Sequence, residues 1–245
     1  MYSQLKRESS NPLYEQLKLS LRRAIATGSY VPHTRIPSER ELCTSYSVSR
    51  MTARQAVMDL VREGMLYTRV GKGTFVAASK IEQPLRVLTG FSQDTEARSG
   101  QATSQVLQAK VIQASPEVAV ALKLPSNDRV ILLKRVRFSD GMALAIEAAH
   151  IPYSLCSDLL SHDFSRESLY QVMSQTFGVQ PMRAEQTLEA NLANEEELFH
   201  LELIAPAPVL RIQRITYRQD GLPIEFVLST YRGDRYKFST VLQSN

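Results

Sequence analysis

The chain has 245 residues, of which 43% are hydrophobic and 22% charged, so it is large enough for one or two globular domains. Its net charge of only +4 excludes a uniformly cationic protein. The sequence shows neither a signal peptide nor the run of about 18–20 apolar residues that a membrane span needs, so we expect a cytoplasmic protein with no membrane partner.

The cysteines and histidines are too scattered to suggest a disulfide framework or a metal site. Cys43 and Cys156 stand far apart in the chain, and the four histidines form no pair at ligand spacing. We therefore expect two reduced thiols, no bound metal and no cofactor.

Charge is distributed unevenly along the chain. Residues 1–78 contain 12 Lys or Arg and 6 Asp or Glu, a net charge of +6, whereas residues 79–245 carry a net charge of −2. A basic amino-terminal segment on a mildly acidic body indicates an anionic partner for that segment, and nucleic acid is the first candidate.

Three helices are predicted in the basic segment. Apolar residues recur every three or four positions over residues 13–28, which indicates a helix that ends at a glycine. Ser38 and Glu41 have the spacing of a capping box at the start of a short second helix. Ser49 is placed to cap a third helix over residues 50–63.

The second and third helices, joined by a short turn, are typical of a helix-turn-helix. The third helix opens with Ser-Arg-x-Thr-x-Arg-Gln, and Arg and Gln can make paired hydrogen bonds to guanine and adenine in the major groove. Residues 65–76 alternate like two strands around a Gly-Lys-Gly tip, which predicts a wing. Each feature alone would also fit an ordinary amphipathic helix or hairpin, but their order within one basic segment favours DNA binding.

This segment resembles the winged-helix domain of the GntR family of bacterial transcription regulators. The resemblance rests on residues 37–42 (PSEREL), 48–56 (VSRMTARQA), 60–64 (LVREG) and 71–76 (GKGTFV). The turn residue Ser47 departs from the family, which usually has glycine there. The resemblance implies that DNA is contacted by Ser38, Arg40, Ser49, Arg50, Thr52, Arg54, Gln55, Gly71, Lys72 and Gly73.

Beyond the basic segment, small and polar residues over 78–85 predict a linker. The remaining chain is expected to mix strands and helices. Strands are expected over residues 106–112, 130–138, 144–151, 183–192, 209–217 and 224–231, and helices over 116–124, 168–177 and 194–203.

A helix–strand–hairpin–strand unit occurs twice in this body. Val130, Arg135 and Phe138 have counterparts 79 residues later, and Glu147 has one 78 residues later at Glu225. The repeat predicts an antiparallel sheet with a pseudo-twofold axis and helices packed on it. Because amphipathic helix–strand units resemble one another, chance similarity is the alternative.

Arg135 and Arg137 stand two positions apart in a predicted strand and therefore share a face. Two neighbouring guanidinium groups repel unless an anion or carboxylates lie between them, and a phosphate could be held by both. The alternative is a solvated sheet face, and the residues themselves leave both interpretations open.

The body is similar to the UTRA effector domain of the HutC-type GntR regulators. The resemblance rests on residues 88–92 (LTGFS), 134–137 (KRVR), 145–152 (AIEAAHIP), 168–170 (SLY) and 231–238 (YRGDRYKF). It implies an α+β protein with a winged helix-turn-helix domain over residues 1–77, a linker over 78–85, and a chorismate-lyase-like UTRA domain over 86–245. This last domain would bind the effector and form the dimer, with helices packed on an antiparallel sheet.

The Tyr-Arg-Gly-Asp-Arg-Tyr ending most resembles the amino-sugar regulators of this type. The resemblance implies that a phosphate is held in this chain by Arg135, Arg137, Ser168, Tyr170 and the loop of Thr89, Gly90, Phe91 and Ser92. The sugar hydroxyls would meet Glu147, Glu225 and Tyr231.

We therefore expect a DNA-binding transcriptional regulator, a repressor of sugar or amino-sugar utilisation genes, controlled by N-acetylglucosamine 6-phosphate or glucosamine 6-phosphate. Because one winged helix reads too few bases alone, a homodimer on palindromic operator DNA is implied. One alternative is a different effector, such as a phosphonate, another sugar phosphate, urocanate or a fatty acid. Another is a chorismate-lyase-like enzyme, but no nucleophile–base pair stands out, so we expect no catalysis.

Overall fold

The computed structural model describes residues 5–6, 9–69, 71–77 and 80–243. The chain forms two compact units, Met1–Ile81 and Glu82–Asn245. None of the helices formed by the described residues combines the length and the apolar composition that crossing a bilayer requires.

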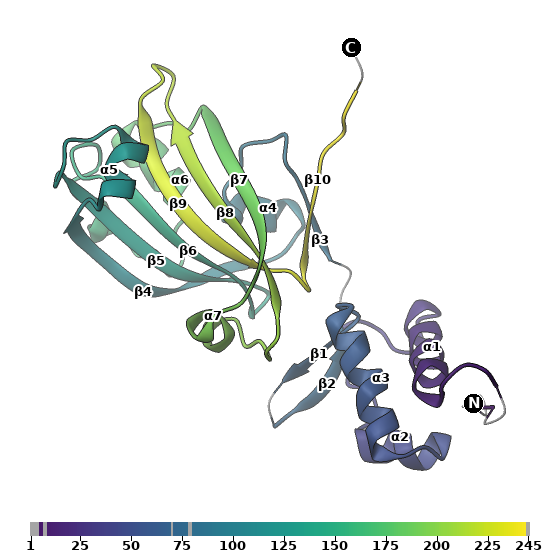
Figure 1. The fold of residues 1–245 in the computed structure, drawn as a ribbon. Coiled ribbons are helices and arrows are strands. Elements are labelled where there is room, and N and C mark those ends of the chain that lie inside the picture. Colours follow the sequence, from purple (N-terminus) through teal and green to yellow (C-terminus); the bar gives the residue numbers. More distant parts are fainter. Residues whose placement is uncertain (1–4, 7–8, 70, 78–79, 244–245) are drawn as a thin grey trace. The chain divides into compact units, whose positions relative to one another are not determined.

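The first unit is a winged helix (Figure 1). It contains helices α1 (Leu13–Ala26), α2 (Glu39–Tyr46) and α3 (Arg50–Arg62) and an antiparallel hairpin of β1 (Leu66–Arg69) and β2 (Gly73–Val76). The apolar faces of the helices meet in a core that includes Leu17, Leu21, Leu42 and Leu60. The predicted helices and wing are thereby confirmed.

Local hydrogen bonds fix the starts of α2 and α3. Ser38 Oγ accepts from the Glu41 N–H at 3.3 Å while the Glu41 carboxylate accepts from the Ser38 N–H at 2.7 Å, which is the predicted capping box. Ser49 Oγ accepts from the Thr52 N–H at 3.1 Å. Between the helices, Ser47 has a φ of 54°, a left-handed conformation that favours glycine. The turn therefore accommodates a Cβ where the resembled family usually has none.

The second unit is built on a six-stranded antiparallel sheet with the order β4-β5-β6-β9-β8-β7. These strands are β4 (Ala102–Gln113), β5 (Arg129–Ser139), β6 (Met142–Pro152), β7 (Arg183–Leu192), β8 (Pro208–Tyr217) and β9 (Pro223–Arg232). Two further strands, β3 (Ile81–Pro84) and β10 (Tyr236–Ser239), pair with each other.

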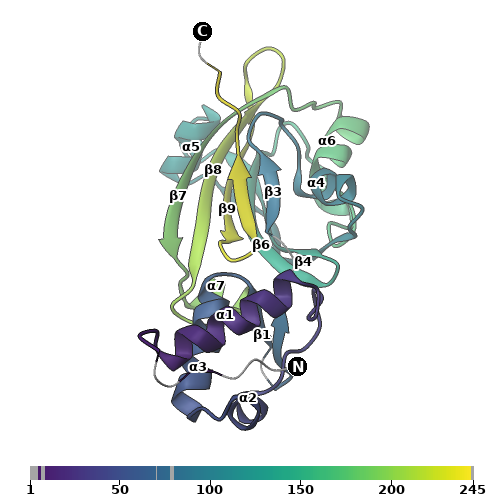
Figure 2. The same cartoon turned by 90° about the vertical axis from the view of Figure 1, so that its right-hand side faces the viewer.

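Helices cover both faces of the large sheet (Figure 2). The first face carries α4 (Phe91–Ala97), α6 (Leu169–Phe177) and the short 3-10 helix η1 (Leu159–Ser161), and the other carries α5 (Pro116–Leu122) and α7 (Glu195–His200). The main core lies between the sheet and α6, where Ile131, Leu133, Ile151 and Met173 are fully buried.

The strand order confirms the predicted repeat. The series β4-α5-β5-β6 and β7-α7-β8-β9 have the same order of elements, and the two halves meet at the antiparallel pair β6–β9. Arg135 and Arg214 hold equivalent positions, because the bulge that follows Arg137 in β5 has its counterpart after Thr216 in β8.

The predicted equivalence of Glu147 and Glu225 is wrong. Glu147 lies opposite Arg135, whereas Glu225 lies opposite Thr216, two positions beyond Arg214 on the neighbouring strand. The connection between β8 and β9 is longer than the one between β5 and β6. The sequence offset between equivalent residues of the two halves therefore changes after this connection. The two carboxylates occupy equivalent strands and the same face but different heights along them.

Residues 81–84, which we expected in the linker, form β3. The Leu85 N–H continues this pairing by donating to the Ser239 carbonyl at 2.8 Å. The partner strand β10 is far away in the sequence, so no local pattern could indicate the pairing. Residues 78 and 79 of the expected linker lie outside the described residues.

Candidate DNA-binding face and ligand pocket

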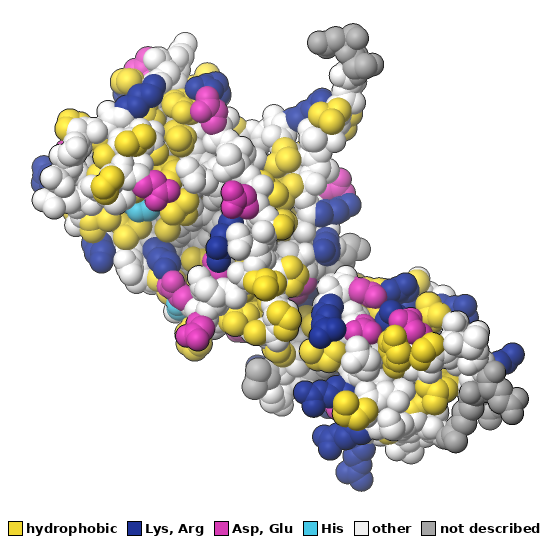
Figure 3. Space-filling model, viewed as in Figure 1, with side chains coloured by type: hydrophobic (Ala, Val, Ile, Leu, Met, Phe, Trp, Pro, Cys, Tyr) yellow, Lys and Arg dark blue, Asp and Glu magenta, His cyan; other side chains and the backbone are white. Residues whose placement is uncertain are grey.

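The side chains predicted to contact DNA lie on the surface of the first unit. Arg40, Arg50, Arg54 and Lys72 are all exposed, and the Arg50 side chain is 87% exposed. Lys and Arg side chains project along the edge that carries the wing and the lower ends of α2 and α3 (Figure 3). An ion pair of 3.8 Å between Arg50 Nε and Glu39 Oε2 links the amino-terminal ends of these two helices.

Other predicted contacts are engaged within the protein. The Ser38 hydroxyl contacts the Glu41 carboxylate at 2.7 Å, and the hydroxyls of Ser49 and Thr52 lie 2.8 Å apart. Gln55 Nε2 donates to Asp59 Oδ1 at 2.9 Å. Ser38 and Ser49 thus cap α2 and α3, and Thr52 contacts the second of these caps. Gln55 would have to release Asp59 before its amide could reach a base.

The wing tip comprises Gly71, Lys72 and Gly73. A Cβ on Gly73, whose φ is 111°, would lie 2.8 Å from Arg35 Nε, so the Arg35 side chain covers this glycine. The backbone of Arg35 also pairs with Phe75 in β2. Sequence reasoning missed Arg35 because it precedes α2 and belongs to no helical pattern.

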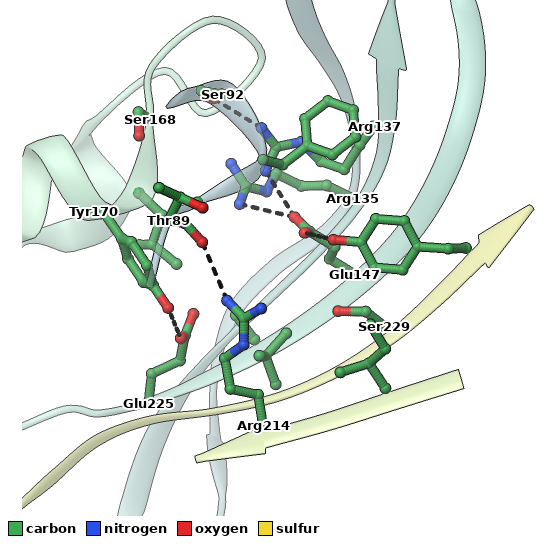
Figure 4. Close-up of a pocket in the computed structure, with 17 residues that line it drawn as sticks. Thr89, Ser92, Arg135, Arg137, Glu147, Ser168, Tyr170, Arg214, Glu225 and Ser229 are labelled. Atoms are coloured by element: carbon green, nitrogen blue, oxygen red, sulfur yellow. Dashed lines mark hydrogen bonds and ion pairs between the residues drawn. The ribbon is translucent and has the colours of Figure 1, made fainter. Parts of the chain in front are cut away.

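A pocket opens on the face of the large sheet that α4 and α6 cover (Figure 4). Its walls come from β5, β6, β8 and β9 and from the residues that lead into the two helices. All the residues predicted for the effector site line this one pocket, namely Thr89, Gly90, Phe91, Ser92, Arg135, Arg137, Glu147, Ser168, Tyr170, Glu225 and Tyr231.

Two buried guanidinium groups share one carboxylate at the upper end of the pocket in Figure 4. Arg137 Nη1 donates to Glu147 Oε2 at 2.7 Å, and Arg135 Nη2 lies 3.6 Å from the same oxygen. Arg137 Nη2 donates to Ser92 Oγ at 2.9 Å, and its guanidinium lies 4.6 Å from the centre of the Phe91 ring. The side chains of Arg135 and Arg137 are 3% and 4% exposed, so the interpretation as a solvated sheet face is wrong.

Several donors of this pair have no partner. Arg135 Nε and Nη1 and Arg137 Nε are buried and make no hydrogen bond within the part of the chain that the structure describes. Burial, helped by repulsion from Arg137, lowers the pKa of Arg135 to about 9, which still leaves the group charged at neutral pH. Burying such donors unpaired is costly, so a ligand with acceptor oxygens would be strongly favoured here.

The start of α6 adds further donors to the same end. Ser168 is the N-cap residue of this helix, but its hydroxyl makes no capping hydrogen bond. The first backbone N–H groups of a helix have no intrahelical acceptor and carry the positive end of its dipole. Since Ser168 and Leu169 line the pocket beside the arginines, these groups create a site for an anion.

The opposite end of the pocket is organised around Glu225. Its Oε2 accepts from the Tyr170 hydroxyl at 2.7 Å and from the Thr216 hydroxyl at 3.0 Å, while Oε1 has no hydrogen bond to the described residues. Because the only hydroxyl proton of Tyr170 is directed to Glu225, Tyr170 would contact a bound anion through its backbone N–H. Glu147 Oε1 accepts from the Tyr231 hydroxyl at 3.4 Å.

The wild-type protein is expected to become less stable to unfolding as pH rises, because Glu225 then loses its proton. Replacing Glu225 with glutamine should make the stability less dependent on pH. Burial is the largest influence on this carboxyl and raises its pKa. Since the folded chain holds the proton more tightly than the unfolded chain, the stabilisation is complete below the usual glutamate pKa of about 4.3 and is lost as pH rises through the raised pKa. Unfolding midpoints across that range should therefore fall more steeply for the wild type than for Glu225→Gln. The exposed Glu189→Gln should keep the wild-type slope, and equal slopes in all three proteins would contradict the expectation.

Arg214 and Ser229 also line the pocket, and sequence reasoning missed both. Arg214 Nη1 donates to the Thr89 carbonyl at 3.2 Å, and Nε donates to Gln186 Oε1 at 3.0 Å. The repeat offset of 79 residues could have identified Arg214, because it leads there directly from Arg135. No such pattern marks Ser229.

Gly90 leaves space for a neighbouring ring. A Cβ built on this glycine would lie 3.2 Å from Cδ2 of Tyr170, so a larger residue would press on that side chain. Gly90 therefore shapes the pocket through the space beside Tyr170.

The arrangement is suited to binding an anion. Three arginines face two glutamates in the lining, which leaves at least one positive charge uncompensated at neutral pH. The described residues contain no cluster of three His, Cys, Asp or Glu side chains that could hold a metal ion. A phosphate at the arginine end and hydroxyl groups toward Glu225 would satisfy the open donors and the open acceptor.

Comparison with known proteins identifies two families in this chain. Residues 13–76 match the family described as bacterial regulatory proteins, gntR family, and residues 97–237 match the UTRA domain. The HTH-type transcriptional repressor NagR of Bacillus subtilis (strain 168) is 37% identical over 96% of both chains. The "Probable fructoselysine utilization operon transcriptional repressor" of Escherichia coli (strain K12) is 33% identical over 89% of both. The crystal structure of PhnF from Mycobacterium smegmatis has a TM-score of 0.65 at 28% identity and covers 93% of this chain and 99% of that one.

Proposed function

Because the chain belongs to the gntR family of bacterial regulatory proteins and carries a UTRA domain, we propose that it represses sugar or amino-sugar utilisation genes under the control of a phosphorylated sugar. Membership of the family makes the chain a DNA-binding transcription regulator and not an enzyme. The predicted α+β fold, a winged helix-turn-helix followed by a UTRA domain, is confirmed.

The buried arginine pair beside the start of α6 is the observation that carries the proposed effector. Arg135 and Arg137 share a single carboxylate and retain unpartnered donors, and a phosphate dianion supplies the acceptors that they lack. The open oxygen of Glu225 at the other end suits a sugar hydroxyl or amino group. We propose N-acetylglucosamine 6-phosphate or glucosamine 6-phosphate. One relative is named for fructoselysine utilisation, and fructoselysine is a sugar derivative, which supports this class.

Thermal unfolding with a panel of hexosamine and hexose 6-phosphates tests the effector class. A ligand at 100 times its dissociation constant stabilises the form that binds it by about 2.7 kcal/mol, which is readily measured as a higher midpoint. A shift with amino-sugar phosphates and none with the unphosphorylated sugars would support the proposal. A shift with a phosphonate or urocanate, and none with any sugar phosphate, would replace it with the alternative effector class.

The proposed DNA partner is a palindromic operator bound by a homodimer. A single winged helix contacts too few base pairs for strong selection, whereas two heads on half-sites about one helical turn apart double the readout. The readout would come from α3 and the wing, aided by Arg40 of α2. Footprinting and sedimentation should show a symmetric site and a dimer, and full affinity for one asymmetric half-site would contradict this arrangement.

Effector control then follows from linkage. The effector can weaken operator binding only by binding more tightly to the conformation in which the two heads fit the half-sites less well. The same coupling makes operator DNA lower the affinity for the effector by an equal factor, which titration with and without operator measures.

Arg54→Ala is expected to weaken operator binding by about 1–3 kcal/mol and to relax selectivity at one base pair. Arg54 is exposed one turn into α3, where a guanidinium can form two hydrogen bonds with guanine. Lys72→Ala, by contrast, should weaken all sequences alike and lower the salt dependence by about one phosphate contact. Fluorescence anisotropy on operators varied one base pair at a time separates the two patterns.

The matched control for these variants is Arg62→Ala. Arg62 is an exposed arginine on the same helix, but it lies in the last turn and pairs with Asp59 at 3.5 Å. It should change selectivity at no base pair. Equal losses on operator and random DNA for Arg54→Ala would show that Arg54 contacts only the phosphate backbone.

A further inference from the structure

A second cavity adjoins the pocket in the effector-binding unit. It lies between residues 83–88, the start of β7 and Phe238 of β10, and Arg214 lines both cavities. Gln186 lines the second cavity and accepts a hydrogen bond from Arg214 Nε at 3.0 Å. Thr89, whose carbonyl accepts from Arg214 Nη1 at 3.2 Å, lines the first. The arginine thus separates the two cavities through hydrogen bonds to neutral acceptors.

The chemistry of the second cavity differs from that of the first. Three guanidinium groups line it, those of Arg86, Arg183 and Arg214, and no carboxylate is among the lining residues. Arg183 pairs with Glu185, but Arg86 makes no hydrogen bond or ion pair with the described residues. The rest of the lining is largely apolar and includes Leu85, Val87, Met182 and Phe238. Val87 and Met182 are 59% and 57% exposed, so this cavity is a groove open to solvent.

Such a lining suits a short aliphatic chain that ends in an anion. The apolar side chains can cover methylene groups, and a carboxylate can accept paired hydrogen bonds from guanidinium groups. A second sugar would need hydroxyl partners, and among the lining residues only two glutamines offer uncharged side-chain hydrogen-bonding groups.

The position of the cavity fixes which part of a ligand could enter it. The anion site at Arg135 and Arg137 is at one end of the pocket, and Arg214 is toward the other (Figure 4). With the phosphate at the arginine pair, the ring carbons farthest from carbon 6 approach Arg214. A substituent on carbon 2 that displaces the bond to Gln186 or Thr89 would pass beside Arg214 into the second cavity.

We propose that this cavity is a second binding compartment, which takes a carboxylate-terminated substituent of a sugar phosphate bound in the first pocket. The substituent carboxylate pairs with Arg214 and Arg86, and the proposal rests on the proposed function of the first pocket. The regulator would then distinguish sugar phosphates that carry an acidic side chain from simple hexosamine phosphates.

Two synthetic ligands of equal length test the proposal. Glucosamine 6-phosphate acylated with succinate carries a terminal carboxylate, and the butyryl derivative has the same chain without it. Calorimetric titration of the full-length protein should give about tenfold tighter binding of the succinyl compound, because hydrogen bonds to a charged group are worth at least this factor. Arg86→Ala should reduce that difference, because only Arg214 then remains to pair with the carboxylate.

Arg86 is the informative variant because it has no partner whose loss could disturb the fold. Arg218→Ala is the matched control. Among the described residues the Arg218 side chain is bonded only to Asp220, in the β8–β9 connection, so this variant should keep the tenfold difference. Equal binding of the two compounds, or an undiminished tenfold difference in Arg86→Ala, would overturn the second compartment while leaving the first intact. If neither compound nor glucosamine 6-phosphate binds, the proposed function itself fails, and the inference fails with it.

Discussion

Replacing Arg137 with alanine is expected to lower the affinity for a sugar 6-phosphate at least about 100-fold while operator binding stays at the wild-type level. Hydrogen bonds from a charged group contribute about 1.5–3 kcal/mol each, and two such bonds to a phosphate account for this loss. Arg137 is 4% exposed, lies beside Arg135, and has an Nε with no partner among the described residues. Isothermal titration measures effector affinity, and anisotropy measures release from the operator.

The conservative variant Arg137→Lys separates charge from geometry. Lysine keeps the positive charge but cannot supply the planar fork that contacts Glu147 and Ser92 together, so an intermediate loss is expected. Circular dichroism should confirm that both variants are folded. An effector affinity within a factor of two of the wild type in Arg137→Ala would show that the phosphate binds elsewhere.

The second large effect is expected from Glu147→Gln, which should lose about 3–5 kcal/mol of stability at neutral pH. Burial opposes ionisation of this carboxyl, but Arg137 and Arg135 together outweigh burial and lower its pKa. A lowered pKa stabilises the folded chain above the usual glutamate value of about 4.3, and this stabilisation is lost as pH falls through the lowered pKa. Glutamine cannot neutralise the two guanidinium groups, so urea unfolding should show a lower midpoint.

The same variant is expected to respond more strongly to anions than the wild type. Without the carboxylate between Arg135 and Arg137, inorganic phosphate is the remaining source of negative charge, and it should restore part of the lost stability. The exposed Glu189→Gln provides the control for removal of a surface charge. Wild-type stability in Glu147→Gln, with no gain from phosphate, would show that the arginines do not depend on this carboxylate.

Much of the fold could be predicted because its elements carry local patterns. The capping box of α2, the cap of α3 and the Gly-Lys-Gly tip lie within a few residues of one another, and all appear in the structure. The long strands of the large sheet alternate clearly and were expected within a few residues of their ends. The short α4 and the strands β3 and β10 were missed, since each is at most seven residues long and depends on partners distant in the sequence.

The residues that line the pocket could be predicted from the sequence, but the hydrogen bonds among them could not. The family resemblance pointed to eleven residues that the fold brings together from both halves of the sheet. It could not show that the Tyr170 hydroxyl donates a hydrogen bond to Glu225, because that bond depends on how α6 lies over β9. Arg214 was within reach of the repeat, but only the pairing register shows which members of the two halves are equivalent.

The duplicated architecture also bears on how a ligand chooses its orientation. If the two halves of the sheet carried identical side chains, a ligand could bind equally well in either of two opposite orientations. Two local differences remove that ambiguity: Arg137 has Thr216 as its counterpart, and the two glutamates stand at different heights. The orientation of a ligand is therefore set by a few side chains and not by the scaffold, and reversing it requires both an exchange of Arg137 and Thr216 and a matching shift of the two glutamates.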